Sequence, residues 1–89
     1  MTRELKRGIY RHFKGNYYYL YETATHTETG EIEVVYRALY GERKLWVRPI
    51  PMWTEILERG GKSYPRFTYI GDVDSDDPTI QELVKKLKV

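Results

Sequence analysis

The chain has 89 residues, a formal net charge of +2 and an aromatic content of 15%. This length predicts one domain, 1–89, and the small net charge does not by itself indicate a nucleic-acid binder. The absence of cysteine excludes disulfides and thiolate chemistry. The sequence has no long apolar run and no signal-peptide pattern, so we expect a cytoplasmic protein that makes no membrane contact.

The first half of the chain predicts consecutive strands. GIYRHFKGN is typical of a short strand, and 17–25 of a longer one because it is rich in aromatic and β-branched residues. HTETGE is predicted to form a hairpin loop in which Gly30 takes a positive φ. IEVVYRALY forms the return strand, GERK the next turn, and LWVRP a further strand that Pro49 and Pro51 end.

The second half predicts two helices and one strand. Pro51 suits the first turn of a short helix over 51–59, and Gly60 suits the position after its end. RFTYI is expected to form a closing strand. Asp77 is predicted to cap a C-terminal helix, about 77–88, whose apolar stripe consists of Ile80, Leu83, Val84 and Leu87.

Together these elements predict an α+β, mainly β fold. Hairpin-length connections favour a bent antiparallel sheet or a small open β-barrel or roll, with one short helix and a C-terminal amphipathic helix. Alternation along 17–25 divides its side chains between two faces. The predicted core face carries Tyr18, Leu20 and Ala24. The predicted outer face, partly covered by neighbouring elements, carries Tyr17, Tyr19 and Tyr21.

One candidate site lies in the His-Thr-Glu-Thr loop. His26 and Glu28 have the residue types of a general acid/base pair, although no nucleophile is visible nearby. The alternative is structural, with the loop side chains satisfying loop amides. A catalytic zinc needs three protein ligands, and the chain has only two histidines, so we expect no metal site and no cofactor.

A second candidate site combines cations with aromatic rings. Bases stack on such rings while phosphates meet the cations, although tyrosines also follow β-propensity alone. Its predicted members are Arg11, His12, Lys14, Tyr18, Tyr36, Arg37, Tyr40, Trp46 and Arg48. Arg37 shares an apolar face and needs a partner, either Glu33 or a bound anion. For Arg48 the choice is between an anion and an ion pair with Glu55 or Glu58.

The segments YRHFKGNYY, HTET, VVYRALYG and LWVRP together resemble the domain-of-unknown-function family sixteen fifty-three, small bacterial and phage domains. The similarity covers about 8–70, and residues 72–89 look like an individual extension. The family pattern usually has Ser at Thr27 and Phe at Trp53. The resemblance implies a small β-roll and no assigned reaction.

The leading functional hypothesis is a non-catalytic binding module for a nucleotide, nucleic acid or other anionic ligand. Its site is predicted where Tyr18, Tyr36, Tyr40 and Trp46 meet Arg37, Arg48 and the 26–28 loop. One alternative is a small acid/base enzyme that uses His26 and Glu28. Another is a protein-interaction domain, such as a homodimer built on exposed tyrosines.

Overall fold

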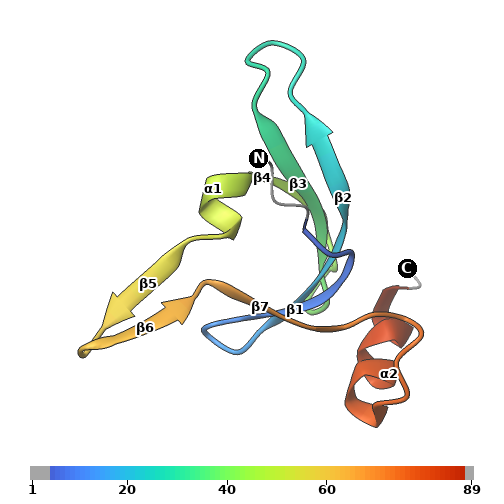
Figure 1. Cartoon of the computed structure of the whole chain (residues 1–89). Helices are drawn as coiled ribbons and strands as arrows, with labels where there is room; N and C mark the ends of the chain where they lie inside the picture. Colours follow the sequence, from blue (N-terminus) through green and yellow to red (C-terminus); the bar gives the residue numbers. More distant parts are fainter. Residues whose placement is uncertain (1–4, 88–89) are drawn as a thin grey trace.

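A computed structural model describes residues 5–87 as a mainly β, α+β fold (Figure 1). Five strands form one antiparallel sheet in the order β4-β3-β2-β1-β7. Their bounds are β1 Gly8–His12, β2 Tyr17–Thr25, β3 Ile32–Ala38, β4 Leu45–Pro49 and β7 Phe67–Gly71. The sheet is open, with β4 and β7 at its edges, so the predicted fold class is confirmed and the sheet does not close into a barrel.

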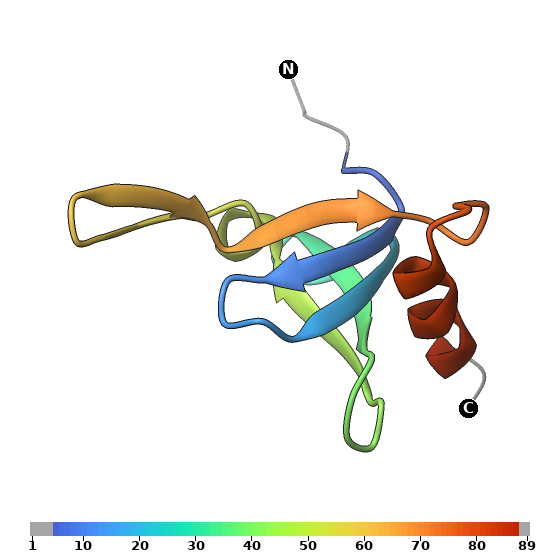
Figure 2. The ribbon, with the colours of Figure 1, turned by 90° about the horizontal axis from the view of Figure 1, so that it is seen from below.

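The remaining elements lie around this sheet. A single helical turn, α1 (Ile50–Trp53), follows β4, and β5 (Ile56–Arg59) pairs with β6 (Lys62–Pro65) as a separate hairpin, which we call the arm. Helix α2 (Pro78–Val84) continues as a 3₁₀ turn, Lys85–Leu87. Figure 2 shows the arm projecting from one end of the sheet and α2 lying at the other. Within residues 5–87, no helix has the length and apolar character needed to cross a membrane.

The predicted helix over 51–59 is wrong beyond its first turn. Thr54 ends α1 by donating from its backbone N–H and its hydroxyl to the carbonyl of Ile50. The chain then forms the arm, whose turn residues Gly60 and Gly61 have φ angles of 57° and 77°. Two successive left-handed residues make the hairpin turn that matches strand twist, and glycine adopts them at little cost.

The face of the sheet that packs on α1, here the α1 face, has a core dominated by rings. Trp53 is 2% exposed and stacks on Phe67, with ring centroids 3.7 Å apart and planes 6° from parallel. Tyr10 and Tyr36 meet the indole edge-on at 5.3 and 4.9 Å. Burying rings of this size removes roughly 150–250 Å² each from water, which is how a one-turn helix can cover a sheet face.

The opposite face, here the α2 face, packs on α2. Asp77 accepts hydrogen bonds from the backbone N–H groups of Thr79 and Ile80, so the predicted cap and helix are confirmed. Of the predicted apolar stripe, two residues are buried and two are partly buried. The core of this face consists of Ile9, Tyr19, Leu39, Ile80 and Leu83.

Two predicted side-chain positions on β2 are wrong. Tyr19, expected on an outer face, is 2% exposed because α2 covers that face. Ala24, expected in the core, is exposed. The β2–β3 register shifts between Leu20 and Glu22, and beyond that point the hairpin extends away from both helices (Figure 1). Alternation is interrupted at such a bulge, and no element within residues 5–87 covers the strand after it.

Candidate functional site

A group of aromatic side chains surrounds Arg48 on the α1 face, beside the area that Trp53 covers. We call this group the aromatic site. Cross-strand pairing explains how it forms, because Tyr36 lies directly opposite Trp46, and His12 directly opposite Phe67. Directly paired residues point to the same side of a sheet. The site consists of His12, Tyr18, Tyr36, Tyr40, Trp46, Arg48 and Phe67.

Arg48 is the central cation of the aromatic site. Its guanidinium carbon lies 5.9 Å from the ring centre of Tyr36 and 5.6 Å from that of Phe67, within the range of cation–π attraction. Its Nε donates a long hydrogen bond of 3.4 Å to the Tyr36 hydroxyl. The expected ion pair with Glu55 is absent because Glu55 binds Arg66, with Nη2 and Oε1 2.6 Å apart.

Glu58, the other expected partner of Arg48, lies on the arm. Within residues 5–87, no carboxylate lies within ion-pair distance of Arg48. A partly buried guanidinium without a counter-ion keeps its positive charge available to an anion.

His12 forms one side of the aromatic site. Its ring meets Phe67 edge-on at 5.0 Å and Tyr18 at 6.1 Å, and its Nδ1 accepts a 3.2 Å hydrogen bond from the backbone N–H of Lys14. Burial lowers the pKa of His12 below 6.5, and the nearby cations Arg66, Arg48 and Lys14 lower it further. The imidazole is therefore neutral at pH 7, and the hydrogen bond to Nδ1 places its proton on Nε2.

The outer rim of the aromatic site is open to solvent. Trp46 is 50% exposed and Tyr40 is 46% exposed, and together with Arg43 and Lys44 they line a shallow pocket of about 200 Å³. The hydroxyls of Tyr18 and Tyr40 lie 2.8 Å apart and share a hydrogen bond. Burial and this hydrogen bond raise the pKa of Tyr18 above its usual range. The rim thus combines flat rings, a hydrogen-bonded pair of hydroxyls and cations.

Two of the predicted cations lie outside the aromatic site. Arg37 lies on the α2 face, paired with Tyr19 across β2 and β3. It donates from Nε to the Tyr21 hydroxyl at 3.0 Å and from Nη1 to the carbonyl of Arg43 at 2.6 Å, rather than to Glu33.

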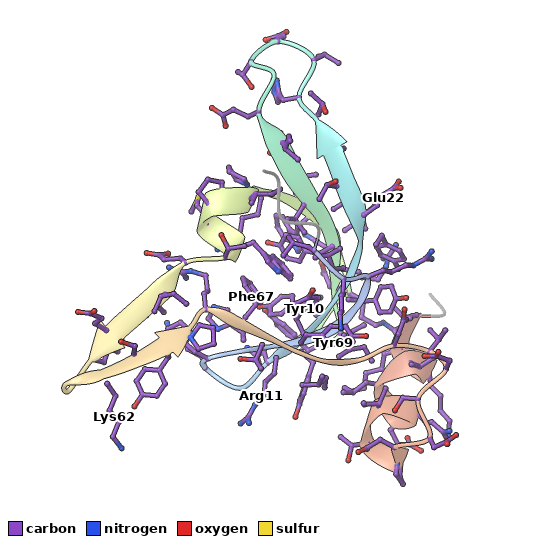
Figure 3. The ribbon with its side chains drawn as sticks, viewed as in Figure 1. Tyr10, Arg11, Glu22, Lys62, Phe67 and Tyr69 are labelled. Atoms are coloured by element: carbon purple, nitrogen blue, oxygen red, sulfur yellow. The ribbon has the colours of Figure 1, made fainter. Side chains whose placement is uncertain are left out.

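Figure 3 shows the second of these residues, Arg11, pointing away from Phe67 and Tyr10. Arg11 lines a separate shallow pocket of about 290 Å³ together with Tyr64 and Thr68. The structure therefore divides the predicted cations between two sides of the sheet.

The His26–Glu28 loop is distant from the aromatic site. Tyr18 and His26 are eight positions apart along β2 and its loop, which corresponds to about 25 Å of strand. The His26 Nδ1 accepts hydrogen bonds from the backbone N–H groups of Glu28 and Thr29, at 3.2 and 3.3 Å. The imidazole thus stabilises the turn, and Glu28 contacts it through its amide. In the described part of the chain, no group of three His, Asp or Glu side chains is arranged to hold a metal ion.

The sequence does not predict Phe67 as a member of the aromatic site. Phe67 reaches it because β7 pairs with β1 across more than fifty residues of chain, a contact that no local pattern reveals. Trp53 stacks on Phe67 and supports that ring. The one signal in the sequence was PRFTYI, which indicates a strand but not its neighbour.

Comparisons with known proteins identify the family. The model of a family described as Protein of unknown function (DUF1653) matches residues 8–69. A crystal structure of a protein belonging to DUF1653 from Bordetella bronchiseptica is 35% identical, with a TM-score of 0.71 over 81% of this chain and 95% of that chain. No curated protein matches the chain. The chain belongs to the DUF1653 family, which confirms the resemblance of its motifs and leaves its activity unassigned.

Proposed function

We propose that this DUF1653 domain is a non-catalytic module that binds single-stranded nucleic acid at the aromatic site. The observation that carries the proposal is Arg48, a guanidinium without a carboxylate partner in residues 5–87, next to the half-exposed ring of Trp46. In this arrangement a phosphate meets Arg48 while neighbouring bases stack on Trp46 and Tyr40. Each stacked base contributes about 1–3 kcal/mol in proteins that bind single strands.

The shape of the site favours a polymer over a free nucleotide. Pockets for small ligands usually enclose roughly 300–1,000 Å³ and bury most of the ligand. The pocket at Trp46 and Tyr40 has about 200 Å³ and lies on an open sheet face. An extended strand can use such a shallow surface because it distributes its contacts over several bases and phosphates.

The charges of the site set the expected salt dependence. Arg48 and Lys14 lie near His12, and Lys44 lies at the rim, where Glu42 partly compensates it. A contact with about two or three phosphates of a single strand gives a slope of log affinity against log salt near −1.5 to −2. The net charge of +2 agrees with modest affinity, between about 1 and 100 μM, the usual range of non-specific binding.

The acid/base alternative at His26 and Glu28 has less support. The His26 Nδ1, the atom that would act as base, already accepts two backbone hydrogen bonds. No polar side chain in residues 5–87 forms a hydrogen bond with the carboxylate of Glu28. A general base needs a free lone pair within reach of its substrate, which this geometry does not offer.

Tryptophan fluorescence tests the binding proposal. Titration with mixed-sequence single-stranded RNA or DNA should quench emission saturably, because Trp46 is half exposed whereas Trp53 is 2% exposed. Trp46→Phe should abolish the quenching, and Arg48→Gln should weaken binding by about tenfold or more, as expected for loss of a charge-assisted contact. Lys85→Gln, in the 3₁₀ turn that follows α2 and paired with Glu82, is the matched control and should leave affinity unchanged.

Three outcomes would oppose the proposal. The first is no quenching at high micromolar oligomer and low salt. The second is quenching that does not depend on salt, because phosphate contacts release counter-ions. The third is an equal loss of affinity in Arg48→Gln and Lys85→Gln, which would indicate diffuse attraction rather than a site.

A further inference from the structure

Strand β4 forms one edge of the sheet and carries exposed apolar side chains on both sides. Leu45, Trp46 and Val47 are 53%, 50% and 60% exposed. Soluble proteins usually protect a strand edge with charge, bulges or a covering element, because an open apolar edge pairs with other chains. We propose that β4 pairs antiparallel with β4 of a second copy of this chain, joining two five-stranded sheets across a twofold axis.

Within residues 5–87, the outward backbone groups of β4 have no hydrogen-bond partner, in the places that the pairing requires. The N–H of Ala38 donates to the carbonyl of Lys44 at 3.2 Å, so Lys44 turns its backbone groups toward β3. Backbone direction alternates along a strand, and Leu45, Val47 and Pro49 therefore turn theirs outward. With Val47 on the twofold axis, the two Val47 residues exchange hydrogen bonds, and each Leu45 N–H reaches the carbonyl of Pro49 of the partner subunit.

This register also accommodates the proline. Pro49 has no N–H, and in this arrangement only its carbonyl is needed. Prolines in sheets are found on edge strands for the same reason, and this one limits the pairing to the length of β4.

Charge selects this register over its neighbours. With Val47 on the axis, Arg48 lies opposite Trp46 of the partner subunit, and the twofold axis gives two equivalent cation–π contacts. With Trp46 on the axis, Arg48 would lie opposite Lys44 of the partner subunit, and with Arg48 on the axis the two guanidinium groups would face each other. Like charges directly opposite each other destabilise a strand pair. LWVRP is thus self-complementary about Val47.

The pairing places two aromatic sites next to each other. Trp46 and Arg48 lie on the same face of β4, so the α1 faces of the two copies form one continuous surface. The dimer is inferred from the edge strand alone and does not depend on nucleic-acid binding. It also replaces the tyrosine stripe of β2 as the basis for a homodimer, because α2 buries Tyr19.

Disulfide formation tests the pairing directly, because the chain has no cysteine and a single introduced thiol is unique. Hydrogen-bonded antiparallel partners have Cα atoms about 5.5 Å apart, within the range that a disulfide spans. Val47→Cys should therefore form a covalent dimer under mild oxidation at least about tenfold faster than Thr68→Cys, because only the first pair is held within disulfide reach. Thr68 is the matched control, exposed on the opposite edge strand, β7.

Sedimentation equilibrium provides the second measurement. The native chain should pass from one to two chain masses as concentration rises, whereas Val47→Lys should remain monomeric with an unchanged circular dichroism spectrum, since Val47 is exposed. A native chain that stays monomeric up to about 1 mM overturns the proposal. Equal cross-linking of the two cysteine variants, or a dimer that persists in Val47→Lys, would place any association on another surface and also overturn it.

Discussion

The hydroxyl of Tyr19 donates a hydrogen bond to the carboxylate of Asp72, with the two oxygens 2.6 Å apart. Tyr19 lies on β2, the central strand of the sheet, and Asp72 is the first residue after β7, at the start of the segment that leads to α2. The same carboxylate oxygen accepts the N–H of Val73 at 2.7 Å. Burial first, and then this hydrogen bond, raise the pKa of Tyr19 to about 12. The contact thus joins the middle of the sheet to the C-terminal helix.

We expect Tyr19→Phe to lower the free energy of unfolding by about 1.5 kcal/mol, the usual contribution of a hydrogen bond to a charged group. The ring and its packing remain, so only the hydroxyl is tested. Urea denaturation followed by circular dichroism measures the change. Tyr64→Phe is the control, because Tyr64 is exposed and its hydroxyl makes no hydrogen bond within residues 5–87. An equal effect in both variants would show that the bond to Asp72 contributes nothing.

The lowered pKa of His12 predicts that acid destabilises the fold. The folded state favours neutral imidazole because of burial and the neighbouring cations, so the folded pKa lies below the unfolded value of 6.5. The stability from this group is fully present above pH 6.5 and is lost as pH falls through the folded pKa. Urea midpoints measured between pH 7 and pH 5 should fall more steeply for the native chain than for His12→Gln. Parallel curves for the two proteins would refute the assignment.

Gly8 is expected to tolerate no side chain. It has a φ of 143°, and an added Cβ would lie 2.5 Å from the carbonyl oxygen of Gly71 and 2.8 Å from the Tyr69 ring. Gly8→Ala should therefore destabilise the protein by about 3 kcal/mol or more, because overpacking adds to backbone strain. Gly30→Ala separates the two effects, since Gly30 also has a positive φ but nothing within 4 Å. Thermal unfolding of Gly30→Ala should show a loss of only about 1–2 kcal/mol in the free energy of unfolding.

The cap of α2 is expected to contribute measurably to stability. Asp77→Ala removes the acceptor of the Thr79 and Ile80 N–H groups and should cost about 1 kcal/mol. Hydrogen exchange of amides in α2 should rise more than exchange in β2 and β3, because the cap acts on that helix. Asp76→Ala, one residue earlier and exposed, is the control and should change neither. Unchanged exchange in Asp77→Ala would contradict the role of the cap.

The C-terminal helix was predictable because its signals are local. Asp77, Pro78 and the spacing of Ile80 and Leu83 specify a start and a buried stripe without reference to the rest of the chain. The arm was not predicted, because Ile56 and Leu57 also fit helical spacing. The Gly60-Gly61 pair between two four-residue segments was the signal for a hairpin. The arm is almost wholly exposed, so tertiary packing does not override this local preference for a turn.

Burial along β2 was only partly predictable. Alternation identifies the two faces of a strand, but it identifies a solvent face only when one side of the sheet is uncovered. Here α1 and α2 cover opposite faces, so Leu20 and Tyr19, adjacent in sequence, are both buried. The register shift after Leu20 then changes the pattern for the rest of the strand.

The aromatic site was predicted in part for a similar reason. Short-range strand pairing brings Tyr18, Tyr36 and Trp46 together, and the sequence indicates those hairpins. The contribution of Phe67 depends on the pairing of β1 with β7, which is non-local. Arg37 does not join the site because its face of the sheet packs on α2, a contact that the local sequence does not reveal.

The arm also gives the chain a natural point of division. Arg59 and Lys62 flank two glycines at an exposed tip, and Figure 3 shows Lys62 there, far from both helices. A trypsin-like protease should cut at this tip first. The C-terminal fragment would remain bound to the N-terminal fragment, because β7 pairs with β1 and α2 packs on the α2 face of the sheet. The domain can therefore be treated as two complementary pieces, suited to reassembly from separately expressed halves or to a circular permutation that opens at the glycines.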